Sequence, residues 1–127
     1  MKAALLLCAA AALLAAPQAR ACGACDEDKV AATYDHAVVA RAAASGRVVV
    51  FCAVQGRVDV KRLRVAAGRV KGLDVASLRT SAEPAALSFA LDSSRQSPQA
   101  AVSALQALAP AGTQLAIVHL QSGPSPH

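Results

Sequence analysis

The stretch RVVVFCAV, residues 47–54, decides the fold. It is rich in valine and shows no alternation of apolar and polar side chains. A β-branched run of this kind is typical of a strand that is covered on both faces of its sheet. We therefore expect residues 47–54 to form a central strand with helices on both sides of it.

Helical and strand patterns alternate along the chain from there to residue 120. Apolar residues recur at steps of three and four after Val58, and two strand-like runs flank the turn at Ala82-Glu83-Pro84. Pro98 follows Ser97 as the first-turn proline of a second helix. The expected elements after the first strand are a helix over 58–70, an edge strand over 73–80, a strand over 86–91, a helix between Ser97 and Pro110, and a strand over 114–120.

This order predicts an α+β domain of the ferredoxin-like βαββαβ kind over residues 47–120. Its first and third strands are central in that topology, and they are the two most apolar runs. Residues 121–127 are turn-rich and predict a flexible tail.

An extra helix is expected before this domain, within residues 22–46. Three acids, Asp26-Glu27-Asp28, suit the positive end of a helix dipole, and the alanine-rich sequence to Ala44 has apolar residues at helical spacing. We expect one helix that covers the sheet face which the ferredoxin-like fold leaves bare. The aromatic residues all fit core positions, namely Tyr34, Phe51 and Phe89.

The first 21 residues predict a cleaved signal peptide. Met1-Lys2 is a positive start, residues 3–16 are uninterruptedly apolar, and Ala19-Arg20-Ala21 matches an A-x-A cleavage site. We therefore expect an exported protein, periplasmic or secreted, that begins at Cys22. Lipidation of Cys22 is less consistent with the sequence, because Arg20 interrupts the usual lipoprotein motif. No segment predicts a transmembrane helix.

The charge excludes some classes of function. Lys and Arg number 13 against 8 Asp and Glu, and removal of the signal peptide lowers the formal charge from +5 to +3 because Lys2 and Arg20 leave with it. With few aromatic residues for base stacking, nucleic-acid binding is not expected. Six basic residues do gather around 58–71. That face is open to three interpretations: a solvated surface, contact with acidic lipid headgroups, or contact with an acidic partner.

Cys22-Gly23-Ala24-Cys25 is the motif that could carry chemistry. Two thiols at this spacing can share one soft metal ion or form a small disulfide. Asp28, one turn on, could reach the pair, and Cys52 could approach only through tertiary packing. Few nitrogen or oxygen donors lie nearby, so Cu(I) or another soft metal ion is favoured over Zn(II), which takes four ligands.

The other candidates have simpler explanations. His36 lies too far along the helix to complete a site with Cys25, since eleven residues span about 16 Å, and we expect it to form a surface pair with Asp35. His119 is expected on the surface of an edge strand. Cys52 lies in an apolar strand and is expected to be a small buried side chain.

Three functions stay open on these residues. The first is a soft-metal protein that holds copper and hands it to a metal-exchanging partner. The second is a structural or interaction module with a Cys22–Cys25 disulfide. The third, a thiol-disulfide exchange protein, is weakened because the motif precedes every strand. No phosphate-binding glycine loop or hydrolase motif is present, so an enzyme is not expected.

Residues 47–120 resemble a heavy-metal-associated domain of the copper chaperone and copper ATPase type. The segment from Gly72-Leu73-Asp74-Val75 to Phe89-Ala90-Leu91-Asp92 is similar to that family's second and third strands. The resemblance implies the ferredoxin-like fold and a link to metal carriage. The family binds its metal through a CxxC after the first strand, whereas residues 53–57 contain no cysteine.

Overall fold

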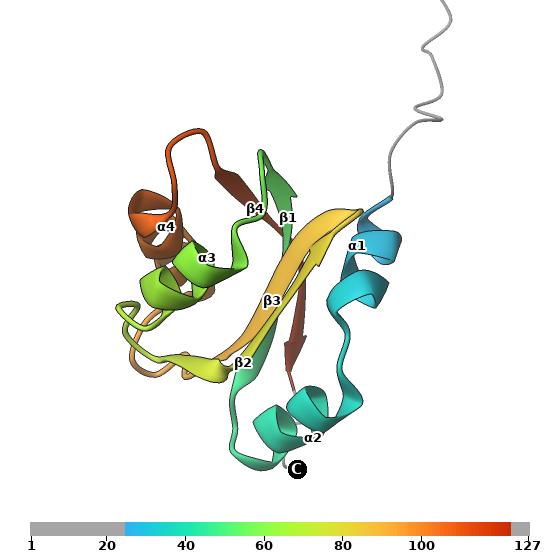
Figure 1. Cartoon of the computed structure of the whole chain (residues 1–127). Coiled ribbons are helices and arrows are strands. Elements are labelled where there is room, and N and C mark those ends of the chain that lie inside the picture. Colours follow the sequence, from blue (N-terminus) through green and yellow to red (C-terminus); the bar gives the residue numbers. More distant parts are fainter. Residues whose placement is uncertain (1–24, 123–127) are drawn as a thin grey trace, which may run out of the picture.

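The fold is a four-stranded sheet between two pairs of helices (Figure 1). The computed structural model describes residues 25–122, so the predicted signal peptide, Cys22 and the predicted tail beyond Ser122 lie outside the described residues. The elements in chain order are α1 (Asp26–Thr33), α2 (His36–Ala44), β1 (Val48–Gln55), α3 (Val60–Ala67), β2 (Leu73–Ala82), β3 (Ala85–Leu91), α4 (Pro98–Leu108) and β4 (Gln114–Ser122).

The strand order confirms the predicted centre of the sheet. The order is β2-β3-β1-β4, and every neighbouring pair is antiparallel. β1 and β3 are therefore central, while β2 and β4 form the edges. This is an α+β fold, and its order is compatible with the ferredoxin-like topology.

Both faces of β1 are buried, as its continuous apolar sequence predicts. Side chains at alternate positions point to opposite faces of a strand. Val50 and Cys52 lie in the core under α3 and α4, whereas Val49 and Phe51 lie in a second, smaller core under α1 and α2. The described domain thus has three layers: a helix pair, the sheet and a second helix pair (Figure 1).

The prediction of one opening helix is wrong, because the chain breaks into α1 and α2 after Thr33. Tyr34 takes an extended backbone conformation, and the Asp35 carboxylate caps α2 by accepting the N–H groups of Ala37 at 2.9 Å and Val38 at 3.3 Å. The same carboxylate accepts Arg79 Nε at 2.9 Å. This hydrogen bond, with the cap, lowers the pKa of Asp35.

Three further expectations need correction. Tyr34 is 46% exposed and is not a core residue, because it occupies the break between the two helices. Helix α3 is shorter than residues 58–70, since Asp59 caps it through the N–H of Arg62 and Gly68 ends it. Strand β4 runs two residues beyond Leu120, because its pairing with β1 continues to Ser122, so Gln121 and Ser122 belong to the sheet and not to the predicted tail.

Strand β2 contains a wide bulge between Asp74 and Arg79. The strand leaves its regular pairing with β3 over these residues. The Ser77 hydroxyl accepts the N–H of Ala90 at 2.7 Å and so takes the place of a backbone carbonyl acceptor of β2. Arg79 fixes the bulge by donating to the carbonyl oxygen of Ala76 at 2.9 Å. Ala76 and Ser77 of the bulge line a cavity together with residues of α2.

Candidate metal site at the start of the first helix

Cys25 lies at the N-terminus of α1 with its side chain exposed. Its Sγ donates a hydrogen bond to Asp28 Oδ2 at 3.4 Å, and its backbone N–H donates to the same oxygen at 3.3 Å. The turn of helix that starts at Cys25 closes through the N–H of Lys29. A sulfur and a carboxylate oxygen therefore meet on one side of the first turn, as the spacing of Cys25 and Asp28 predicts.

The acidic first turn controls the protonation of this thiol. The hydrogen bond to Asp28 and then the charge of Asp28 raise the pKa of Cys25 above its usual value, and Glu27 adds to the shift. At this position the positive end of the helix dipole favours the thiolate of Cys25, whereas the acids favour the neutral thiol. The effect of the acids on the pKa is the larger of the two. The free protein thus holds Cys25 as a neutral thiol at pH 7, and a soft cation has to displace its proton in order to bind.

The structure does not bring Cys52 to this place. Cys52 is 1% exposed and belongs to the core beneath α3 and α4, whereas α1 lies on the opposite face of the sheet. Burial raises the pKa of Cys52 to about 12. The prediction of a small buried side chain is confirmed, and we remove Cys52 from the candidate ligands.

Neither histidine within the described range approaches Cys25. His36 is exposed in the first turn of α2, and Asp35, its expected partner, instead caps the helix and binds Arg79. The ring of His119 packs against Phe51 with 5.7 Å between ring centroids. Across residues 25–122, no group of three or more His, Cys, Asp or Glu side chains is placed to hold a metal ion. Further ligands for Cys25 would have to come from outside that range, where Cys22 lies.

The predicted basic face is confirmed as surface. All six basic side chains of this face are exposed: Arg57, Lys61, Arg62, Arg64, Arg69 and Lys71. Between α3 and the end of α4 the surface is hollowed, with Val65 and Leu108 exposed among the cations. No helix of the described residues is long and apolar enough to span a bilayer.

One feature was missed at the level of sequence: a cavity of about 200 Å³ between α2 and β2. Arg41 from α2, Arg47 just before β1 and Asp74 from β2 all line it. The one signal in the sequence is the imperfect alternation of residues 73–80, which marks the bulge. Nothing in the spacing of the two arginines predicts that they share a cavity.

The fold and this cysteine define a small α+β protein with an exposed thiol, unpaired among residues 25–122, at the start of its first helix. No family model, curated protein or solved structure matches the chain.

Proposed function

We propose that this is an exported protein that binds a soft metal ion, most plausibly Cu(I), through Cys22 and Cys25. The observation that carries the proposal is the environment of Cys25, an exposed side chain at the N-cap of α1 with the Asp28 carboxylate in contact. A two-thiolate site suits Cu(I), which accepts low coordination with soft ligands. The ferredoxin-like order of the sheet adds support through the resemblance to metal-carrying domains.

The place of the thiol favours holding and transfer of the metal over catalysis. Cys25 is the exposed N-cap residue of α1. An ion held there stays open to a partner's ligands, and a ligand exchange needs no opening of the core. Because so few further donors lie nearby in the described residues, the ion would keep free coordination positions for that partner.

Asp28 has a definite part in this proposal. By raising the pKa of Cys25 it makes protons compete with the metal, so binding strengthens as pH rises. In Asp28→Asn the hydrogen-bond geometry can persist while the negative charge is lost, which lowers the pKa of Cys25 toward its usual value. At neutral pH this variant should then bind Cu(I) more tightly than the wild type, and its affinity should stop rising with pH at a lower pH.

Native mass spectrometry of the exported protein, purified with its thiols protected from air, tests the proposal. We expect a species that begins at Cys22 and carries one copper ion. Cys22→Ser and Cys25→Ser should each lose the copper, and Cys52→Ser is the matched control that should retain it. A metal-free species two hydrogens lighter than the dithiol, even after copper loading, would refute metal binding and favour the structural disulfide.

A further inference from the structure

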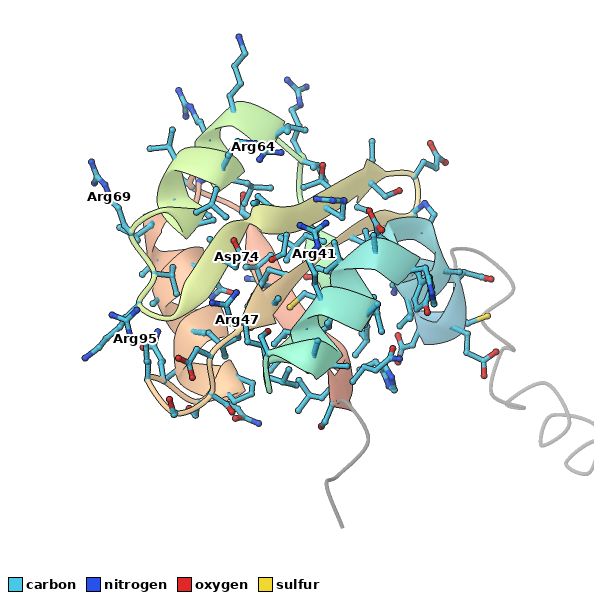
Figure 2. The ribbon with its side chains drawn as sticks, turned by 90° about the horizontal axis from the view of Figure 1, so that it is seen from below. Arg41, Arg47, Arg64, Arg69, Asp74 and Arg95 are labelled. Carbon is cyan, nitrogen blue, oxygen red and sulfur yellow. The ribbon has the colours of Figure 1, made fainter. Side chains whose placement is uncertain are left out.

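Arginines gather at the end of the molecule where β1 and β2 begin (Figure 2). They come from five separate parts of the chain, so no single sequence motif contains them. Figure 2 shows them on the same side of the molecule as Asp74, and Asp92 also lies near Arg47 and Arg95. The arginines are Arg41 in α2, Arg47 before β1, Arg64 in α3, Arg69 after α3, and Arg95 between β3 and α4.

The cavity between α2 and β2 opens within this cluster and has a mixed lining. Its buried apolar lining comes from Val38 and Ala42 of α2 and from Ala90 of β3. At about 200 Å³ it is smaller than a typical drug-sized site. The charged residues of its lining are Arg41, Arg47 and Asp74.

Arg47 is held in place at this cavity. Its Nη1 donates to Asp74 Oδ2 at 3.3 Å, and Asp74 Oδ1 accepts the N–H of Ala76 at 3.1 Å, within the bulge. The guanidinium has five N–H groups, so this single contact leaves most of them available. Asp74 thus acts as a positioning residue, and the rigid bulge fixes Asp74.

Arg41 supplies a second, uncommitted cation. Within residues 25–122 Arg41 has no acidic partner at ion-pair distance, because the nearby Asp74 pairs with Arg47 instead. The cavity therefore carries two positive side chains against one negative. Beyond it, Arg95 and Arg47 both contribute, after hydrogen bonds from Ser94, to the lowered pKa of Asp92. Arg47 therefore lies between two carboxylates, Asp74 and Asp92.

We propose that this cavity binds a phosphate monoester, with Arg41 and Arg47 on the phosphate and the buried apolar lining under its short organic part. Planar guanidinium groups bind phosphate oxygens in pairs, and a dianion with three terminal oxygens can engage two guanidiniums at once. The surrounding arginines concentrate such an anion near the cavity. The phosphate can belong to a small soluble ester or to a lipid headgroup, and both present the same chemistry.

The test for a soluble ester is a titration of ¹⁵N-labelled protein with glycerol 3-phosphate at constant ionic strength, followed by NMR. We expect saturable shifts of the backbone amides of Ala42, Ala76 and Ala90. Arg41→Gln should weaken binding by at least about tenfold, since a hydrogen bond to a charged group is lost. Arg57→Gln removes the same charge from an exposed site outside the cavity and should leave the affinity within about twofold.

The test for a lipid source is co-sedimentation with phosphatidylcholine vesicles that contain phosphatidic acid, which is also a phosphate monoester. Binding that Arg41→Gln reduces and Arg57→Gln does not, without saturable shifts from glycerol 3-phosphate, assigns the phosphate to lipid. The proposal is overturned if neither probe binds, if acetate binds as well as glycerol 3-phosphate, or if the two variants weaken binding equally. Far-UV circular dichroism of each variant confirms that the fold is retained.

Discussion

Phe51→Ala tests whether the α1–α2 layer is part of the folded core. Phe51 is completely buried and is the one large side chain among the buried residues of that face, which are otherwise Val38, Ala42, Val49 and Ala90. Truncation of a buried Phe to Ala costs about 3–5 kcal/mol, because apolar contacts are lost and a cavity remains. Domains of this size are stable by about 5–15 kcal/mol. The substitution should therefore remove about a fifth or more of the free energy of unfolding.

The assay is urea unfolding followed by far-UV circular dichroism, since the protein has no Trp for fluorescence. Leu63→Ala, in the core beneath α3 and α4, is the matched comparison and should cost about 2–5 kcal/mol. Hydrogen exchange separates the two variants: only Phe51→Ala should speed exchange in α1 and α2 relative to α3. A loss below about 1 kcal/mol in Phe51→Ala would refute a true core on that face.

Three further predictions follow from single contacts. Asp35→Asn keeps the helix cap but loses the charged hydrogen bond to Arg79. Because folding lowers the pKa of Asp35, the wild type should be more stable than the variant at pH 7, and this difference should vanish as the pH falls below about 4. Urea unfolding midpoints of the two proteins measure the difference. Under native conditions iodoacetamide should modify Cys25, increasingly as pH rises, and should modify Cys52 only after unfolding, which peptide mass spectrometry measures. Gly56→Ala should lower thermal stability more than Gly46→Ala, because both have positive φ but only at Gly56 would a Cβ come within 2.8 Å of a facing backbone oxygen.

The sheet could be predicted from the sequence because its signals are local. The unbroken apolar run around Phe51 demands two covered faces, and the runs on either side of Pro84 predict the hairpin. The sequence also carries a signal for the break after Thr33, since Asp35 is a good N-cap residue. The alanine-rich helical spacing on both sides of Asp35, however, is also typical of one continuous helix. In the structure, the bond between Asp35 and Arg79, 44 residues later, favours the break.

Of the two candidate sites, the sequence predicts the one at Cys25 and does not predict the arginine cavity. The contact between Cys25 and Asp28 follows from three-residue spacing at a helix start, so it could be predicted. The arginine cavity could not, because Arg41, Arg47 and Asp74 meet only after the sheet has formed and β2 has bulged around Ser77. Imperfect alternation marks such a bulge but does not tell which side chains will face it.

The opposed charges of the two ends give the molecule a permanent electric dipole moment. The first turn of α1, which carries Asp26, Glu27 and Asp28, lies at the end of the sheet where β2 turns into β3 (Figure 1), whereas the labelled arginines gather where β1 and β2 begin (Figure 2). A negatively charged surface exerts a torque on such a molecule and turns its arginines toward that surface. The first turn of α1 then faces the medium. A protein molecule in this orientation exposes Cys25 to molecules in solution, while its arginines stay against the surface.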